Sequence, residues 1–269
     1  MLPAQIALPY YGGKSSHLDF IYEHLPPGDH FVDVFGGGGS VIFNLLPGSY
    51  PVNRTYNDFD SRLVNFYRVL RIDPDTLLDW AALTPSSREE FEEAKEPADD
   101  PLEDARRFWV RLSQSRSNQS SDSAGWSYSF DGQAKGGGLS ERRAWVLRRM
   151  SQELLHMNIE NLDFHELIRL YDRPGVVFYC DPPYMPGTRT AQGNYKYELT
   201  VEDHECLSKW LNAARAKVLL SGYDSPEYSE WYKDWRRIEG EEKVISASSN
   251  AGKTGSGMSS RREILWLKE

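Results

Sequence analysis

The sequence predicts an α/β protein with a parallel sheet, interrupted by a mostly helical insert. Two observations indicate this class. Strand patterns alternate with stretches of helical spacing before residue 70 and again after residue 156, and no clear strand pattern occurs in between. We therefore expect one α/β domain made of residues 1–70 and 156–269, with an inserted domain at residues 71–155.

The N-terminal part of this pattern begins with a short buried strand at residues 30–35, which runs into four glycines at 36–39. The apolar residues 41–46 after this turn indicate the start of a helix. Residues 52–58 form a second strand pattern, and residues 63–70 have apolar side chains at helical spacing. Two strands that alternate with two helices predict parallel pairing.

The insert contains two helix patterns around a polar loop. Residues 102–112 have helical spacing, and Ser140 is suited to cap a second helix that ends near residue 156. Between them, residues 113–138 are rich in serine and glycine with aromatic residues interspersed, which predicts a mobile loop.

The α/β pattern resumes with a buried strand at residues 175–181. Thr200 is suited to cap a helix, and residues 217–221 form another strand pattern. Residues 242–247 and 262–267 alternate between polar and apolar side chains, as in an antiparallel hairpin joined by a Gly/Ser-rich loop.

The composition excludes several classes of protein. Of the 269 residues, 39% are hydrophobic and 13% aromatic, which is enough for a core and excludes a disordered chain. The longest uncharged apolar run, residues 176–180, is far shorter than the roughly 20 residues that span a bilayer. The first residues lack a secretory signal and two cysteines cannot form a disulfide framework, so we expect a cytoplasmic protein.

The net charge of −9 is unevenly distributed. Residues 75–104 hold eleven acidic and two basic side chains, whereas residues 105–149 hold nine basic and three acidic ones. A basic segment can neutralise DNA phosphates even in an acidic protein. The alternative, which the charge pattern alone favours, is a pair of solvated helix faces.

The glycine turn at 36–39 indicates a ligand that passes close to the backbone at the start of a helix. The dinucleotide fingerprint G-x-G-x-x-G fails, because Val41 and Ile42 occupy the places of its third glycine. Asp58, at the end of the second strand, is suited to accept hydrogen bonds from both ribose hydroxyls of an adenosine-containing ligand. A helix cap is the alternative role for Asp58.

Asp181-Pro182-Pro183-Tyr184 ends a buried strand and gives the sharpest signal in the chain. The two prolines end the strand and restrict the backbone. The Asp181 carboxylate and the Pro182 carbonyl are two acceptors, which suit an amino group with two donors, and Tyr184 offers a ring face. This combination fits a flipped-out base with an exocyclic amine. The alternative is a proline turn capped by aspartate.

These motifs occur in an order that resembles the Dam-like family of DNA adenine methyltransferases. The resemblance covers residues 8–70 and 156–268, and the insert matches only in position, where such enzymes carry their target-recognition domain. The matching segments are Tyr10-Tyr11-Gly12-Gly13-Lys14, residues 31–40, Asn57-Asp58, Asp163-Phe164, Asp181-Pro182-Pro183-Tyr184, and residues 201–204, 220–224 and 262–266.

The resemblance implies a Rossmann-like S-adenosylmethionine-dependent methyltransferase sheet with a reversed last hairpin, and methylation of adenine N6 in double-stranded DNA. It places Asp181, Pro182 and Tyr184 at the target base. Such a transfer needs no metal. The cofactor-binding residues that it implies are Tyr11, Lys14, Asp33, Phe35, Gly36, Gly38, Ser40, Asp58, Asp163, Phe164 and Asp181.

We expect the DNA contacts in the insert. Basic side chains there would bind phosphates, and loop aromatics would wedge into the gap left by the flipped base. The alternative for the aromatics is packing beneath their own loop. The candidate DNA-binding residues are Arg116, Trp126, Tyr128, Lys135, Arg142 and Arg143.

Three other functions remain open from the sequence: a cytosine N4 methyltransferase, an RNA adenine methyltransferase and a DNA-binding module without activity. Asp181, where a cytosine enzyme more usually has serine, tilts the choice toward adenine. The recognised DNA sequence and a partner restriction endonuclease also remain open. Because one adenine per turnover needs one active site, we expect a monomer, with no metal and no membrane.

Overall fold

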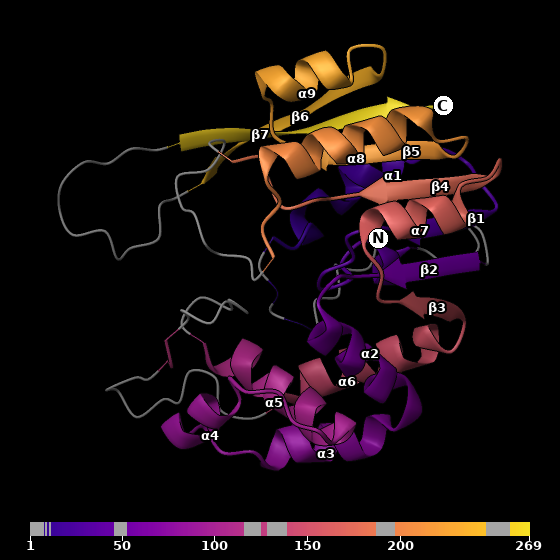
Figure 1. Cartoon of the computed structure of the whole chain (residues 1–269). Helices are drawn as coiled ribbons and strands as arrows, with labels where there is room; N and C mark the ends of the chain where they lie inside the picture. The colour runs from indigo at the N-terminus through magenta and orange to yellow at the C-terminus, as the bar shows by residue number, and fades with distance from the viewer. Residues whose placement is uncertain are drawn as a thin grey trace.

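The computed structural model describes the chain at residues 8, 10, 12–45, 53–115, 125–127, 139–186, 197–245 and 259–269. A seven-stranded sheet with the order β3-β2-β1-β4-β5-β7-β6 forms its centre (Figure 1). The first five strands in this order pair in parallel, and β7 runs antiparallel to both β5 and β6. The strands are β1 (His30–Asp33), β2 (Asn53–Asn57), β3 (Met157–Glu160), β4 (Val176–Cys180), β5 (Lys217–Gly222), β6 (Arg236–Ile245) and β7 (Ser259–Lys268).

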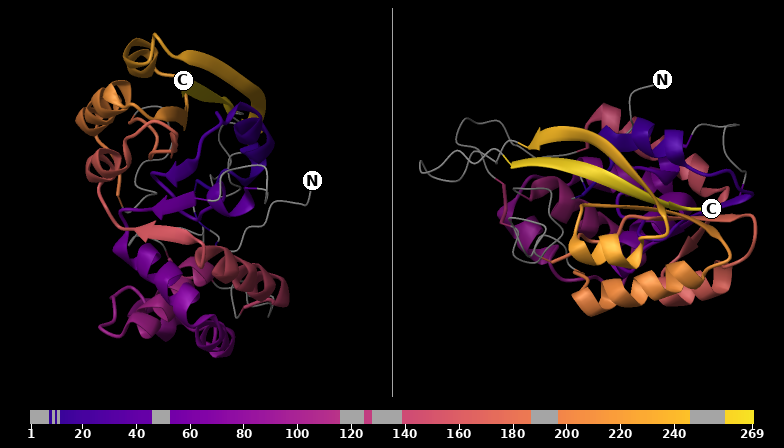
Figure 2. Two further views of the ribbon diagram at one scale, coloured as in Figure 1. Left: turned by 90° about the vertical axis from the view of Figure 1, so that its right-hand side faces the viewer. Right: turned by 90° about the horizontal axis from the view of Figure 1, so that it is seen from above.

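This sheet confirms the predicted α/β class with a reversed last hairpin. Helices cover both of its faces, because the two faces of a parallel sheet are apolar and must both be buried. The helices α7, α8 and α9 lie on one face and α1 on the other, which the two views of Figure 2 show. These helices are α1 (Leu18–His24), α7 (Phe164–Tyr171), α8 (Val201–Ala213) and α9 (Pro226–Trp231).

Successive residues of each central strand face opposite cores. In β1, Phe31 belongs to the core that α1 covers, whereas Val32 belongs to the core that α7 and α8 cover. In β4, Tyr179 and Phe178 divide in the same way. Because both sides of such strands are buried, their sequences are continuous apolar runs, which explains why β4 is recognisable from the sequence.

A second group of helices lies beyond the β3 edge of the sheet, coloured from violet through magenta to rose at the bottom of Figure 1. α5 packs against α2, α3 and α4, and α6 packs against α2 and α3. Trp109 and Leu147 of this group share one apolar core with Phe31 and Tyr56 of the sheet. The insert therefore packs continuously with the sheet, and its boundaries at residues 71–155 stay a sequence-based prediction. The helices are α2 (Ser61–Ile72), α3 (Pro74–Leu83), α4 (Arg88–Glu93), α5 (Pro101–Gln114) and α6 (Glu141–Leu154).

Capping side chains determine where several helices begin. The Ser140 hydroxyl accepts a hydrogen bond from the backbone N–H of Arg143 and starts α6. Thr200 and Asp203 form a reciprocal capping box at the start of α8. Both caps confirm the sequence prediction, since the signal that they carry is local.

Three differences from the sequence prediction concern residues 41–46 and the strands β3 and β6. At residues 41–45, the described part of the predicted helix start, the chain forms a 3-10 turn at Ile42–Asn44. Four of the five residues at 41–45 are buried, which fits a tight turn inside the core and not an amphipathic helix. β3 was not predicted, because four residues with two apolar side chains give no clear pattern. β6 begins at Arg236, earlier than predicted. Its first residues were not predicted from the sequence because β6 is a charged strand at the edge of the sheet.

No helix within the described residues combines the length and the apolar character that crossing a membrane requires.

Candidate active site

A cavity of about 420 Å³ opens at the carboxyl ends of β1, β2 and β4. The order of the sheet reverses between β1 and β4, and open α/β sheets bind ligands at such a switch point. The lining residues are Tyr10, Gly12, Gly13, Val34, Phe35, Gly36, Gly37, Gly38, Ser40, Asn57, Asp58, Phe59, Leu162, Asp163, Phe164, Asp181, Pro183, Tyr197, Glu198, Leu199 and Asp203.

The glycine turn after β1 brings bare backbone to the cavity wall. Gly37 and Gly39 have φ angles of +49° and +67°, a left-handed conformation that favours glycine. The Gly36 N–H donates to the Asn57 carbonyl at 2.8 Å, and the Tyr56 hydroxyl donates to the Gly37 carbonyl at 2.8 Å. A Cβ at Gly36 would lie 2.3 Å from the Tyr56 ring. β2 therefore fixes the turn against the cavity.

Asp58 leaves β2 with its carboxylate already oriented. One oxygen accepts from the Gly37 N–H and the other from the Asp60 N–H, each at 2.8 Å. Burial raises the pKa of Asp58 to about 6, although these two backbone donors oppose the rise. Each carboxylate oxygen can accept more than one hydrogen bond. The group can therefore bind two further donors from a ligand in the cavity.

Asn57 ties the segment between β3 and α7 to the end of β2. Its amide nitrogen donates to the carbonyls of Val34 and Leu162 at 2.9 and 3.1 Å, and its amide oxygen accepts from the Leu162 N–H at 2.9 Å. These bonds bring Leu162 and Asp163 to the cavity. Asp163 is also the N-cap of α7, since its Oδ1 accepts from the His165 N–H at 3.1 Å.

Asp181, directly after β4, stands between the cavity and a buried ammonium group. Its Oδ1 lies 2.8 Å from Lys14 Nζ, and the Lys14 side chain is 3% exposed. Burial raises the pKa of Asp181, and the ion pair with Lys14 opposes that rise. Asp181 and Pro183 line the cavity, with the buried Pro182 between them in the chain. A ligand in the cavity would therefore meet Oδ2, because Lys14 engages Oδ1.

Lys14 joins Asp181 to residues far away in the chain. Its Nζ lies 2.7 Å from the Tyr184 hydroxyl and 3.3 Å from Glu263 Oε1. Burial lowers the pKa of the ammonium group, but the Asp181 and Glu263 carboxylates outweigh this and hold the pKa well above its ordinary value. Lys14 is therefore a permanent positive charge behind Asp181.

Tyr184 stacks on Tyr223, which follows β5. The ring centroids are 4.2 Å apart and the ring planes differ by 10°. Lys14 Nζ also lies over the Tyr184 ring, 4.6 Å from its centroid, so both Tyr223 and Lys14 contact this ring, and stacking of a base on it stays a prediction.

The predicted site residues separate into a cavity wall and a buried layer next to it. Asp33 belongs to the buried layer. Burial raises the pKa of Asp33 well above its ordinary value, and the Asp181 and Asp58 carboxylates add to the rise. Tyr11 lies outside the described residues. The residues that line the cavity are Phe35, Gly36, Gly38, Ser40, Asp58, Asp163, Phe164 and Asp181, and those that do not are Lys14, Asp33, Pro182 and Tyr184.

Several lining residues escaped the sequence analysis. Phe59 follows Asp58 directly and packs edge-on against Tyr197, with the ring centroids 5.1 Å apart. The position of Phe59 after a strand-end acid is a signal that could have found it. Tyr197, Glu198 and Leu199 reach the cavity through the tertiary fold, and no local pattern marks them.

The predicted DNA-binding residues lie partly outside the described chain, as Arg116, Tyr128 and Lys135 do. The Trp126 indole donates to Gln114 Oε1 at 3.2 Å, and the Arg88 guanidinium lies 4.9 Å from its ring centroid. Trp126 thus packs on the insert itself, and its contact with DNA stays a prediction.

Arg142 and Arg143 lie in the first turn of α6, Arg142 exposed and Arg143 half-buried. In Figure 1, α6 begins on the left, the side to which the arrowheads of β2 and β4 point. The start of this helix therefore lies on the same side of the molecule as the cavity, and contact of the two arginines with phosphates stays a prediction.

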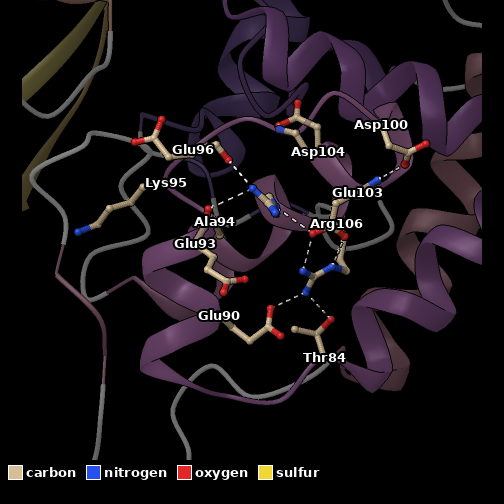
Figure 3. Close-up of polar contacts among 12 residues, drawn as sticks. Thr84, Glu90, Glu93, Ala94, Lys95, Glu96, Asp100, Glu103, Asp104 and Arg106 are labelled. Carbon is tan, nitrogen blue, oxygen red and sulfur yellow. Dashed lines mark hydrogen bonds and ion pairs between the residues drawn. The ribbon is translucent and has the colours of Figure 1, made fainter.

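Other arginines of the basic segment are engaged inside the insert. Arg106 pairs with Glu90 and Glu103, both at 2.7 Å, as Figure 3 shows. Arg107 pairs with the same Glu103 at 2.9 Å, and Arg111 is buried with its guanidinium 4.6 Å from the Phe91 ring centroid. The acidic and basic segments therefore neutralise each other across α4 and α5.

In the part of the chain that the structure describes, no group of three or more histidine, cysteine, aspartate or glutamate side chains could hold a metal ion. Asp58 and Asp181, which follow β2 and β4, instead bring hydrogen-bond acceptors to the cavity. Such a site can bind a ligand rich in N–H and O–H donors.

Comparison with known proteins defines the class of this one. Residues 10–245 match the family described as D12 class N6 adenine-specific DNA methyltransferase, and the chain belongs to this family. It is 26% identical over 266 residues to the Type II methyltransferase M1.LlaDCHI of Lactococcus lactis subsp. cremoris, covering 90% of each chain. It is also 26% identical over 254 residues to the DNA adenine methylases of Salmonella typhi and Escherichia coli K12, covering 84% of this chain and 83% of theirs.

The protein is therefore an adenine-specific DNA methyltransferase, and DNA is its substrate. Family membership decides among the functions that the sequence left open, in favour of adenine in DNA.

Proposed function

We propose that the protein transfers a methyl group from S-adenosylmethionine to the N6 amine of an adenine flipped out of double-stranded DNA. When bound, this cofactor supplies an electrophilic methyl group on a positively charged sulfur. The observation that carries the proposal is that Asp58 and Asp181 line one cavity, so that a ribose-binding acid and a base-binding acid share a single site.

The residues of the cavity fit this cofactor. Asp58 would hold the ribose hydroxyls, because each of its oxygens has room for a further hydrogen bond. The free oxygen of Asp163 would accept from the adenine amine of the cofactor, since Oδ1 caps α7. Phe35 and Phe164 lie with ring centroids 6.0 Å apart at the same wall and offer apolar surface. The remaining proposed contacts are Tyr11, Gly36, Gly38 and Ser40, together with Lys14 and Asp33 from the buried layer next to the cavity.

Asp181 and the Pro182 carbonyl would bind the target amine. The lone pair of adenine N6 is delocalised into the ring, so the amine is a poor nucleophile. Hydrogen bonds from its two hydrogens to Asp181 Oδ2 and the Pro182 carbonyl would localise the lone pair as the nitrogen becomes tetrahedral. These acceptors act mainly in the transition state, where positive charge develops on the nitrogen.

Tyr184 would position the flipped base through its aromatic ring. Arg116, Trp126, Tyr128, Lys135, Arg142 and Arg143 would bind the DNA around it. We further propose that the enzyme works as a monomer in the cytoplasm. The Type II name of a relative supports a companion restriction endonuclease.

Two substitutions separate the two ends of the site. Asp58→Ala should weaken binding of S-adenosylmethionine at least about tenfold, because hydrogen bonds to a charged group each contribute roughly 1.5–3 kcal/mol. Asp181→Ala should abolish methyl transfer to duplex DNA and leave cofactor binding within about twofold, since it removes an interaction of the transition state. Calorimetric titration and a transfer assay measure the two effects.

Asp79→Ala, an exposed acid in α3, is the matched control and should change neither quantity. Unchanged cofactor affinity in Asp58→Ala would remove Asp58 from the site. Near-normal turnover by Asp181→Ala would contradict the mechanism.

A further inference from the structure

We propose that Glu263, oriented by Ser221, is a positioning residue for methyl transfer. It holds Lys14 against Asp181 and cancels the ammonium charge, so that Asp181 meets the target amine with its negative charge intact. The inference rests on the proposed function, in which Asp181 accepts from the amine, and it assigns roles to two side chains of β5 and β7.

Glu263 is an acid in the interior of the sheet. It lies in β7, between β5 and β6, and is 2% exposed. Its Oε1 lies 3.3 Å from Lys14 Nζ and accepts from the Ser221 hydroxyl at 2.5 Å. Ser221 is fully buried in β5 and pairs in register with Leu265 of β7. Two neighbouring strands thus fix the direction of one carboxylate, which points at the ammonium group behind Asp181.

The net charge of Asp181, Lys14 and Glu263 together has a consequence for the reaction. Lys14 alone would form a neutral pair with Asp181, and a neutral pair stabilises developing positive charge less than a free carboxylate does. With Glu263 as the second carboxylate, the three groups carry a net charge of −1. Lys14 can therefore fix Asp181 by an ion pair of 2.8 Å without removing the negative charge from the site.

Other titratable groups also face Asp181 from the surrounding elements. The tyrosines and the cysteine have pKa values raised by burial, so they are neutral in the working pH range. Burial likewise raises the pKa of Asp33 and favours its neutral form. Lys14 and Glu263 therefore carry the charges that act most directly on Asp181. The groups are Asp33 of β1, Tyr179 and Cys180 of β4, Tyr184 after β4, Tyr228 of α9, Lys14 and Glu263.

A purely structural ion pair is the competing explanation, because Glu263 also links β7 to the segment before α1. A structural role predicts lower thermal stability when the pair is broken. It does not predict a directed change in the ionisation of Asp181. The test must therefore follow Asp181 itself.

The experiment is a carbon-13 NMR titration of the Asp181 carboxyl group in the cofactor-free protein, assigned with Asp181→Asn. Glu263→Gln removes a negative neighbour, so the pKa of Asp181 should fall; Lys14→Met removes a positive neighbour, so that pKa should rise. Ser221→Ala keeps both charges but frees Glu263, and should give a smaller fall. Glu239→Gln, an exposed acid in β6, is the matched control and should give no shift.

Single-turnover methyl transfer then measures the consequence. Glu263→Gln should lower the plateau rate roughly tenfold or more, with cofactor and DNA affinities within about twofold, and move the acid limb of the rate profile to lower pH. An unchanged pKa of Asp181 in Glu263→Gln, or a plateau rate equal to the wild type, would overturn the proposal. If the wild type fails to methylate adenine, the proposed function fails, and the NMR titration still decides the charge coupling.

Discussion

At the scale of single residues, Asp58 shows how the fold prepares a binding group. Its two oxygens accept backbone hydrogen bonds from Gly37 and Asp60, so the carboxylate is held in place before any ligand arrives. Burial of this carboxyl group raises its pKa to about 6. An acid that must be ionised to accept two hydroxyl donors therefore titrates close to the working pH.

The pH dependence of cofactor binding tests this residue. The ionised form of Asp58 binds, so affinity for S-adenosylmethionine should be complete above pH 7 and fall as the pH drops through about 6. About one tenth of the carboxyl group remains ionised one unit below its pKa, so at pH 5 affinity should be about tenfold weaker than at pH 8. Calorimetric titration across this range measures the effect.

Asp58→Asn is the control, because it removes this titration and leaves every other ionisation in place. The variant should bind weakly at all pH values, and the step near pH 6 should disappear. A wild-type affinity that stays constant between pH 5 and pH 8 would contradict the assignment.

Residue roles could be predicted from the sequence where the signal is local. Asp58 and Asp181 each follow a recognisable strand, and parallel strands place such residues at one edge of the sheet. The surroundings of Lys14 could not be predicted, since its partners Tyr184 and Glu263 are 170 and 249 positions away in the chain. Two signals were available for Glu263: it directly precedes the apolar residues 264–267 of β7, and it lies in the segment 262–266 that resembles the family.

At the scale of structural elements, the glycine turn after β1 is fixed against the end of β2. Gly39 has a φ of +67°, and a Cβ there would lie 2.3 Å from the Phe43 ring, which packs against Tyr67. Gly39→Ala should therefore destabilise the fold by about 2 kcal/mol or more, from left-handed strain and overpacking. Thermal or denaturant unfolding measures the change.

Gly13→Ala is the matched control, at a glycine that lines the cavity. Its φ is not positive, and its Cβ would meet only the Tyr10 carbonyl at 3.6 Å, an ordinary contact. This variant should unfold like the wild type. Equal stability of the two variants would contradict the role given to Gly39.

The helices and strands that could be predicted from the sequence are those with a continuous buried apolar run or a capping residue. The apolar run of β4 and the cap at Thr200 act through neighbouring residues and appear directly in the sequence. β3 is a four-residue edge strand whose existence depends on pairing with β2, so the sequence alone does not mark it. The turn at Ile42–Asn44 was mistaken for a helix start, because its apolar residues face a core that only the tertiary fold supplies.

At the scale of the whole molecule, the separation of charge along the chain does not survive folding. Arg106 and Arg107 of the basic segment pair with Glu90 and Glu103 of the acidic one, and Arg148 pairs with Asp75. Counting charges by segment therefore overestimated the basic surface, since ion pairs between distant segments cannot be derived from composition. The exposed start of α6 remains a candidate surface for phosphates.

Salt dependence tests this surface. Neutralising Arg142 and Arg143 together with glutamine should reduce the slope of log affinity for duplex DNA against log salt by about 2, if each contacts one phosphate. The control, Arg169→Gln with Lys209→Gln on α7 and α8, changes the net charge equally and should change the slope less. Equal slopes for the two double variants would exclude α6 from the interface.

The central claim is methyl transfer to the adenine amine at the site of Asp181. The most direct measurement is transfer of labelled methyl from S-adenosylmethionine to unmethylated duplex DNA, followed by nucleoside analysis of the digest, for the wild type and Asp181→Asn. We predict label on adenine N6 with the wild type and none with the variant, although the variant still binds cofactor. Label on the cytosine amine, or no transfer by a wild-type protein that binds the cofactor, would contradict the account.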